Sequence, residues 1–248
     1  MRRNILITGA SSGLGAEMAR QFAADGRNLA LCARRGDRLE QLRAEVLAEH
    51  PGSTVAVRTL DVDDHDAVFA TFRALDTELG GLDRVVVNAG IGKGQPVGTG
   101  RFDANRATAF TNFVSALAQC EAAMELFRAR GRGHLVVVSS VSAVRGMRGN
   151  ITAYAASKAA VASLAEGIRA DVLGTDIRVT TLFPGYIRSE MNSRSPRTPL
   201  MVDTAPGVAA MVRAMERERA TATVPGWPWV PVSWVLRHAP LRLVAKAT

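Results

Sequence analysis

Short apolar runs alternate with longer stretches of helical periodicity along most of the chain. Runs typical of buried strands lie at residues 4–8, 28–33, 54–60, 82–87, 135–138 and 177–183, with a last one at 222–224. Helical patterns start after the first run and later cover residues 37–49, 65–79, 103–128, 154–173 and 204–217. Such alternation predicts an α/β fold with a doubly wound parallel sheet, whose ligands bind beyond the carboxyl ends of the strands.

The composition narrows the possible classes of protein. The 248 residues, 47% of them apolar, suit one large domain with a substantial core. The formal charge of +8 comes from scattered arginines without a basic block or interleaved aromatic residues, so we expect no nucleic-acid partner. Cys32 and Cys120 lack metal-ligand and disulfide spacing, so we expect core residues of a cytoplasmic protein and no metal. The apolar run before Gly9 is too short for a secretory signal.

A glycine-rich turn joins the first predicted strand to the first predicted helix. Residues 8–15 read Thr-Gly-Ala-Ser-Ser-Gly-Leu-Gly. In the order strand, glycine turn, helix, the glycines let the backbone approach a pyrophosphate at the helix N-terminus. We therefore expect this turn to bind a dinucleotide through Gly9, Ser11, Ser12, Gly13, Leu14 and Gly15.

The end of the second predicted strand indicates which dinucleotide. Arg34-Arg35 follows the strand, and no acidic residue comes before Asp37. A carboxylate here would bind the ribose 2′-hydroxyl, whereas arginines accommodate a 2′-phosphate, so the pattern favours NADP(H) over NAD(H). Arg34 is the first candidate and Arg35 the second. The alternative is an ordinary solvated pair of arginines.

Two further strand ends carry candidate cofactor contacts. After the third strand, Asp61-Val62 offers a carboxylate that can accept from the adenine amino group, although a helix N-cap role for Asp61 or Asp63 is the alternative. The fourth strand ends in Asn88-Ala89-Gly90. These small residues let the strand end lie against a flat adenosine, and Asn88 can tie neighbouring strand ends together.

A tyrosine and a lysine at helical spacing are the candidate catalytic groups. Tyr154 and Lys158 stand at i and i+4, so their side chains share one helical face. A neighbouring cation favours the phenolate and is expected to lower the tyrosine pKa toward neutrality, which suits a general acid/base. Only three of the 31 basic residues are lysines, which indicates that a compact ammonium is required at this position. Asn112, inside a predicted helix, also calls for a specific role.

These motifs occur together and in order, and the chain resembles the short-chain dehydrogenase/reductases over residues 4–190. The residues that carry the resemblance are Thr8-Gly9-x-x-x-Gly13-x-Gly15, Asn88-Ala89-Gly90, Asn112, Ser140, Tyr154-x-x-x-Lys158 and Pro184-Gly185. The resemblance implies a Rossmann-type fold, a homodimer or homotetramer, and hydride transfer between a nicotinamide and a carbonyl or alcohol carbon.

The resemblance also implies roles for individual residues. Tyr154 exchanges the proton of the substrate oxygen, and Ser140 hydrogen-bonds that oxygen. Lys158 lowers the tyrosine pKa and holds the nicotinamide ribose, while Asn112 positions a water that links Lys158 to solvent. The further implied cofactor contacts, with the carboxamide and the phosphates, follow the sixth strand: Pro184, Gly185, the Ile187 backbone and Ser189.

One departure from the family pattern concerns the serine. Ser140 lies fourteen residues before Tyr154, one more than is usual in the family. Ser142 is the alternative, but we favour Ser140 because it directly follows a strand and is held rigidly. A protein that binds NADP(H) without turnover is the alternative function, and its sign would be a missing catalytic residue.

The chain is expected to divide into three parts of one domain. Residues 1–190 form the dinucleotide-binding and catalytic core, and residues 191–224 form a substrate lid, a helix and the last strand. Residues 225–248 form a tail that contains all three tryptophans, several basic residues and no acidic residue. This tail packs on its own domain, on a second subunit or on a membrane surface as a peripheral contact. Its apolar character favours an apolar substrate, such as a steroid-like or long-chain lipid.

Overall fold

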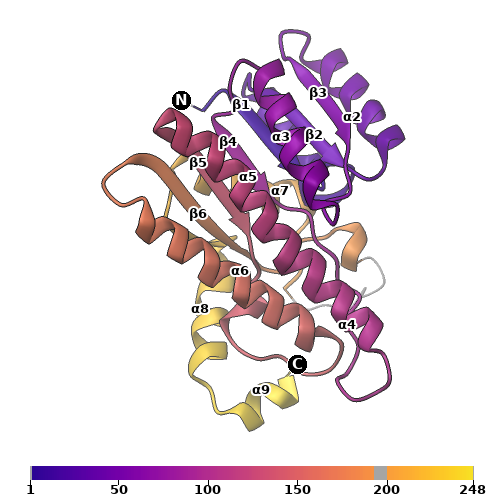
Figure 1. Cartoon of the computed structure of the whole chain (residues 1–248). Coiled ribbons are helices and arrows are strands. Elements are labelled where there is room, and N and C mark those ends of the chain that lie inside the picture. Colours follow the sequence, from indigo (N-terminus) through magenta and orange to yellow (C-terminus); the bar gives the residue numbers. More distant parts are fainter. Residues whose placement is uncertain (1, 193–199, 248) are drawn as a thin grey trace.

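A seven-stranded, wholly parallel sheet forms the centre of the molecule (Figure 1). The computed structural model describes residues 2–192 and 200–247. The strand order is β3-β2-β1-β4-β5-β6-β7, which confirms the predicted doubly wound fold. The strands are β1 (Asn4–Thr8), β2 (Asn28–Ala33), β3 (Val55–Thr59), β4 (Arg84–Val87), β5 (Arg132–Val138), β6 (Asp176–Pro184) and β7 (Thr221–Val224).

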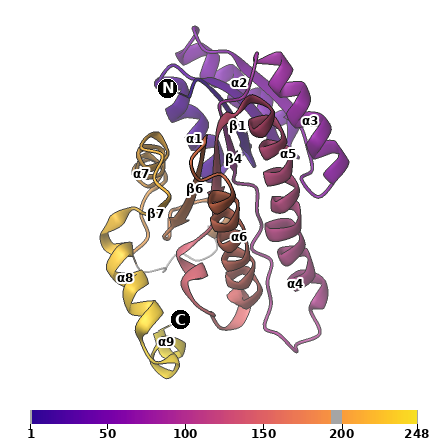
Figure 2. The ribbon, with the colours of Figure 1, turned by 60° about the vertical axis from the view of Figure 1, so that its left-hand side comes forward.

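Helices cover both faces of this sheet, because its strands are apolar on both sides. Ile5 and Ile7 of β1 belong to one buried core, and Leu6 between them belongs to the other. The first core packs against α1 (Gly13–Ala24), α2 (Gly36–Glu49) and α7 (Thr204–Glu216). The second packs against α3 (His65–Glu78), α5 (Ser115–Arg130) and α6 (Thr152–Asp171), and Figure 2 shows α7 and α5 on opposite sides of the sheet.

The order of the strands reverses at β1, which lies between β2 and β4. In doubly wound sheets, ligands bind outside the carboxyl ends of the strands at this point. The phosphate turn and Asn88 follow β1 and β4, respectively. The fold therefore brings the predicted cofactor contacts to the expected place.

The long helix predicted at 103–128 is interrupted. It consists of α4 (Phe102–Ala109), one π-helical turn (Phe110–Val114) and α5. Single π turns inside α-helices are often found at functional sites. Asn112, the polar residue that needed a reason, lies in this turn.

The tail from residue 225 folds into two helices, α8 (Gly226–His238) and α9 (Leu241–Ala247), and α8 lies beside β7 and the 3-10 turn at Val141–Val144 (Figures 1 and 2). The side chain of Arg145 donates to the carbonyl oxygens of Leu236 and Ala239, at 2.8 and 2.6 Å, and so holds the end of α8. Trp229 is buried, whereas Trp227 and Trp234 are 81% and 65% exposed. The tail thus packs on its own domain through one tryptophan and leaves two outside. Most of the predicted lid, at 193–199, lies outside the described residues.

A buried polar cluster lies toward the amino-terminal ends of the strands, away from the predicted site. Arg84 donates to His134 Nδ1 at 2.9 Å, to Glu216 Oε1 at 2.6 Å and to the Met215 carbonyl oxygen at 3.0 Å. Because Nδ1 of His134 accepts, its Nε2 carries the proton and donates to Thr180 Oγ1 at 2.8 Å. Burial, together with Arg84, holds the pKa of His134 well below its usual value. This cluster ties β4, β5, β6 and α7 together.

Candidate active site

The phosphate turn is built around two close backbone approaches that need glycine. Gly9 has φ of +66°, and a Cβ there would lie 2.9 Å from the Cα of Ala89. A Cβ on Gly15 would lie 2.4 Å from the carbonyl oxygen of Gly9. The turn therefore folds tightly onto the start of α1, where backbone N–H groups can bind a phosphate. A pyrophosphate fits this arrangement of glycines.

Asn88 joins the ends of β1 and β4, as its position in the sequence suggested. Its side-chain amide donates to the carbonyl oxygen of Thr8 at 2.8 Å. The Thr8 hydroxyl in turn accepts from the backbone N–H groups of Asn88 and Ala89, both at 3.1 Å. A Cβ on Gly90 would lie 3.0 Å from Asn112 Oδ1 and 3.5 Å from Lys158 Nζ. This strand end therefore packs against both the phosphate turn and the candidate catalytic groups.

Arg35, rather than Arg34, lies against the phosphate turn. Arg35 donates to Ser11 Oγ at 3.2 Å and to Ser12 Oγ at 2.6 Å, whereas Arg34 is exposed. The Arg35 guanidinium also contacts the Glu190 carboxylate at 3.0 Å, and Arg38 contacts the same carboxylate at 2.5 Å. Arg38 was not among the predicted cofactor contacts. The i, i+3 spacing of Arg35 and Arg38 at the start of α2 is the signal that could have found it.

Asp61 and Val62 follow β3 as expected, but the alternative N-cap role is wrong. Asp64 caps α3 instead, because its carboxylate accepts from the N–H of Ala67 at 3.0 Å. Asp61 is exposed and accepts from the N–H of Asp63 at 3.2 Å. Val62 is a core residue.

Tyr154, Ser140 and Lys158 come together at the carboxyl end of β5. The Ser140 hydroxyl lies near that of Tyr154 and lowers the pKa of Tyr154. Lys158 Nζ lies 5.9 Å from the centre of the Tyr154 ring and donates to the carbonyl oxygen of Val138 at 2.8 Å. Ser142 donates to Ser140 Oγ from its N–H and its hydroxyl, at 3.2 and 2.9 Å. Ser140 therefore faces Tyr154, and Ser142 holds Ser140 in place.

The acid/base properties of this pair differ from the sequence-based expectation. Burial raises the pKa of Tyr154, and the hydrogen bond with Ser140 offsets this only in part. Burial also lowers the pKa of Lys158 to about 8. The expected lowering of the tyrosine pKa by Lys158 is therefore wrong for this protein without a cofactor, since desolvation is the larger effect. With a raised pKa, Tyr154 is protonated at neutral pH and so holds the proton that a carbonyl reduction requires, but it is a weaker acid than a free tyrosine.

Asn112 has a defined task in the π turn. Its Oδ1 accepts from the N–H of Ile91 at 2.8 Å, and its Nδ2 donates to the carbonyl oxygen of Ile91 at 2.9 Å. Nδ2 also lies 3.2 Å from Ser157 Oγ, and this hydroxyl donates to the carbonyl oxygen of Tyr154 at 2.7 Å. The π turn thus connects the segment after Gly90 to the helix that carries Tyr154.

The segment after β6 lies on another side of the Tyr154 side chain. A Cβ on Gly185 would lie 2.2 Å from the indole of Trp229, so Pro184-Gly185 needs a glycine to accommodate α8. Tyr186, which the sequence analysis did not single out, packs edge-on against Trp229 with a ring separation of 5.1 Å. The Tyr186 side chain also raises the pKa of Tyr154. Tyr186 therefore belongs to the surroundings of the candidate acid/base.

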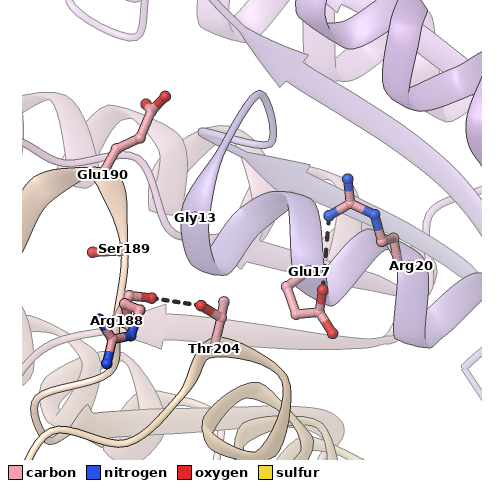
Figure 3. Close-up of a pocket in the computed structure, with 7 residues that line it drawn as sticks. All are labelled: Gly13, Glu17, Arg20, Arg188, Ser189, Glu190 and Thr204. Carbon is pink, nitrogen blue, oxygen red and sulfur yellow. Dashed lines mark hydrogen bonds and ion pairs between the residues drawn. The ribbon is translucent and has the colours of Figure 1, made fainter. Parts of the chain in front are cut away.

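Ile187 and Ser189 continue this wall toward the phosphate turn. Ile187 is buried and bridges to Val202, and a Cβ on Gly13 would lie 3.3 Å from the Cβ of Ser189. A pocket of about 470 Å³ opens here, lined by Gly13, Glu17, Arg20, Arg188, Ser189, Glu190 and Thr204 (Figure 3). It lies beside the phosphate turn rather than over Tyr154. Within the described residues, no cluster of His, Cys, Asp and Glu could hold a metal ion.

Known proteins with similar sequences and structures are dehydrogenases and reductases. Residues 3–199 match the family described as short chain dehydrogenase. An uncharacterized oxidoreductase of Mycobacterium tuberculosis is 56% identical over 245 residues, which cover 99% of this chain and 97% of the relative. The structure is similar to a short-chain dehydrogenase from Sphingobium yanoikuyae in complex with NADPH, at 26% identity and a TM-score of 0.83, covering 98% and 96% of the two chains.

A second solved structure shares the fold with a different cofactor. It is a short chain dehydrogenase/reductase from Burkholderia phymatum in complex with NAD, with a TM-score of 0.86 and coverage of 100% and 96%. Its sequence identity is 20%, so this likeness concerns the fold alone. Solved structures of this fold therefore include complexes with both types of nicotinamide dinucleotide.

Proposed function

Because the chain belongs to the short-chain dehydrogenase/reductase family, we propose that it is an NADP(H)-dependent oxidoreductase acting on a carbonyl or secondary alcohol. The observation that carries the proposal is the group formed by Tyr154, Ser140 and Lys158. A partly buried phenol with a raised pKa contacts a serine hydroxyl, one helical turn from a buried amine. This combination can donate a proton to a substrate oxygen at neutral pH.

In the reduction, the carbonyl carbon gains a hydride and its oxygen gains a proton. Bound NADPH supplies the hydride. The Tyr154 hydroxyl donates the proton, and the Ser140 hydroxyl hydrogen-bonds the same oxygen and orients it. Lys158 lies beneath the Tyr154 ring beside Gly90, where its amine can hold a ribose hydroxyl. Asn112 holds the backbone of Ile91, next to Gly90, through two hydrogen bonds. We also propose that Asn112 positions a water near Lys158.

The proposed preference for NADP(H) rests on the arginines of this chain. Arg35 places its guanidinium group beside Ser11 and Ser12, and Arg38 shares the Glu190 carboxylate with it, at the end of β2 where the adenosine ribose is expected. The carboxylate that would select NAD(H) is absent from residues 34–36, directly after β2. Catalytic efficiencies with NADPH and NADH test the preference, and equal values would contradict it.

A protein that binds NADP(H) without turnover is the competing function. The catalytic group argues against it, because Ser140, Tyr154 and Lys158 are all present and in contact or near contact. The test is the decay of NADPH fluorescence with ketosteroids, long-chain 3-oxo lipids and quinones, with the Tyr154→Phe variant as control. Consumption by the unmodified protein alone supports an enzyme for an apolar carbonyl substrate. No consumption with any of these substrates supports the competing function.

We further propose that α8 seats this protein on an anionic membrane surface. Trp227, Val230 and Trp234 are exposed along α8, and no acidic residue follows Glu218. Exposed tryptophans favour the membrane interface, and basic residues such as Arg237 favour anionic headgroups. None of the helices within residues 2–192 and 200–247 is long and apolar enough to cross a membrane, so the proposed contact is peripheral.

Vesicles of phosphatidylserine and phosphatidylcholine test this contact. The unmodified protein should co-sediment at low salt and release at high salt, because headgroup attraction is screened. The double variant Trp227→Ala, Trp234→Ala should not bind, whereas Phe102→Ala, which removes another exposed aromatic side chain, should bind normally. If the double variant instead changes the sedimentation of the protein alone, α8 is an interface of the proposed homodimer or homotetramer.

The buried, unpaired cysteines fit the proposed cytoplasmic location.

A further inference from the structure

Two arginines hold one carboxylate beside the serines of the phosphate turn. Arg35 donates to Ser11 Oγ, to Ser12 Oγ and, at 3.0 Å, to Glu190 Oε2. Arg38 donates to Glu190 Oε1 at 2.5 Å. Each carboxylate oxygen is therefore held by a different guanidinium group.

The members of this cluster come from three separate parts of the chain. The serines belong to the turn after β1, the arginines lie at the start of α2, and Glu190 begins a short 3-10 helix after β6. In Figure 3 the Glu190 side chain points away from Arg188 and Thr204. A second pocket, of about 320 Å³, is lined in part by Ser11 and Arg38. Glu190 thus connects the segment after Pro184-Gly185 to the place where the adenosine ribose is expected.

A carboxylate between two guanidinium groups uses the donors that a phosphate group would use. A phosphate monoester carries about −1.5 to −2 charges at pH 7 and three acceptor oxygens, so it binds arginines more strongly than a carboxylate does. Both anions cannot accept from the same N–H groups at the same time. The arginines hold the pKa of Glu190 at about 2, so the carboxylate stays charged at any pH used for an assay.

We propose that Glu190 is a specificity-determining residue that competes with the 2′-phosphate of NADP(H) for Arg35 and Arg38. This proposal rests on the proposed preference for NADP(H). The 2′-phosphate displaces Glu190, whereas NAD(H), which lacks this group, leaves the ion pairs in place. Because the binding-competent state must first lose these pairs, the observed affinity for NADP(H) is lower than its intrinsic value.

Removal of the Glu190 charge should therefore tighten binding of 2′-phosphorylated ligands alone. The test measures the dissociation constants of 2′,5′-ADP, ADP, NADPH and NADH for the unmodified protein and for Glu190→Gln. We expect the variant to bind 2′,5′-ADP and NADPH about three- to tenfold more tightly, the range that one or two exposed ion pairs can supply. ADP and NADH should change by less than about twofold on the same reasoning.

Glu17→Gln is the matched control, since Glu17 lines the same pocket and pairs with Arg20 at 3.7 Å rather than with Arg35 or Arg38. It removes the same charge and should leave the ratio of 2′,5′-ADP to ADP affinity unchanged. Equal tightening of all four ligands by Glu190→Gln, no change, or weaker binding of 2′,5′-ADP would each overturn the proposal. If the unmodified protein binds 2′,5′-ADP no better than ADP, the NADP(H) preference fails instead. The fragments undergo no hydride transfer, so neither result depends on turnover.

Discussion

A buried cation lies at each end of the sheet, and the two cations differ in their hydrogen-bond partners. Toward the amino-terminal ends, Arg84 is 1% exposed and reaches an imidazole, a carboxylate and a carbonyl oxygen. At the carboxyl ends, Lys158 is 6% exposed and, within the described part of the chain, donates one hydrogen bond, to a backbone carbonyl. Burial of a charge is costly unless the charge is paired.

The difference supports the proposal that the carboxyl end of the sheet carries the chemistry. Burial lowers the pKa of both cations, but the ion pair with Glu216 opposes this effect at Arg84. At Arg84 the polar groups satisfy one another and tie four elements together. Lys158, which has no carboxylate partner among the described residues, lies beside a phenol and the strand end at Gly90. A shifted pKa alone therefore does not identify either end as catalytic. The ends differ in that the Lys158 amine can still donate to a ligand, whereas Arg84 already donates to three protein groups.

The largest effect is expected at the catalytic end. Tyr154→Phe removes the proton donor and little volume, so kcat should fall by at least about 100-fold. Binding of NADPH should stay within about twofold, because the hydroxyl is directed to Ser140. Steady-state kinetics and a fluorescence titration on the same preparation check both parts. A variant with near-normal turnover would show that another group donates the proton.

The next effect is expected at the structural end. Arg84→Met leaves His134 without its donor and removes one of the two arginine partners of Glu216, of which Arg27 remains, so it should destabilise the fold by about 3 kcal/mol. For a domain of this size that corresponds to a melting temperature lower by roughly 6–12 °C. Thermal unfolding measures this change, and kcat at a temperature well below the transition should stay within about twofold. A stable Arg84→Met variant that lost activity would reverse the comparison.

Much of this arrangement could be predicted from the sequence because it depends on local order. The strand pattern fixed the doubly wound sheet, and the i, i+4 spacing placed Tyr154 beside Lys158. The pairing of Arg35 and Arg38 with Glu190 could not be predicted, since it joins residues more than 150 positions apart. The direction of the Tyr154 pKa shift was also out of reach, because it depends on burial created by the tertiary fold. Helix α8 was likewise not predicted, because its segment contains prolines. It packs on the domain through Trp229, which lies against Gly185.

A pH titration of stability separates the two ends further. The pKa of His134 is lowered in the folded protein, so the unfolded chain takes up a proton near pH 6.5 while the folded chain does not. Stability should therefore fall as the pH decreases below about 6.5, by up to about 1.4 kcal/mol per pH unit from this group. Denaturant unfolding between pH 7 and 5 measures the slope. His134→Gln, which keeps a polar side chain without a titrating ring, should show a smaller slope, and an unchanged slope would exclude His134 as its source.

The comparison of the two cations is tested most directly by Lys158→Met, with stability and turnover measured on the same sample. The pKa of Lys158 is about 8 in the folded protein, against 10.5 for the free side chain. The protonated amine therefore destabilises the fold below pH 8. This destabilisation decreases as the pH rises from 8 toward 10.5. After subtraction of the lost hydrogen bond to Val138, Lys158→Met should stabilise the protein by about 1–2 kcal/mol at pH 7. Turnover should be lost, and Lys158→Arg should not restore it, because a planar guanidinium is larger than an ammonium. A Lys158→Met variant that is more stable and inactive is the predicted result, whereas one that is destabilised and active would contradict the assignment of the carboxyl end as the catalytic one.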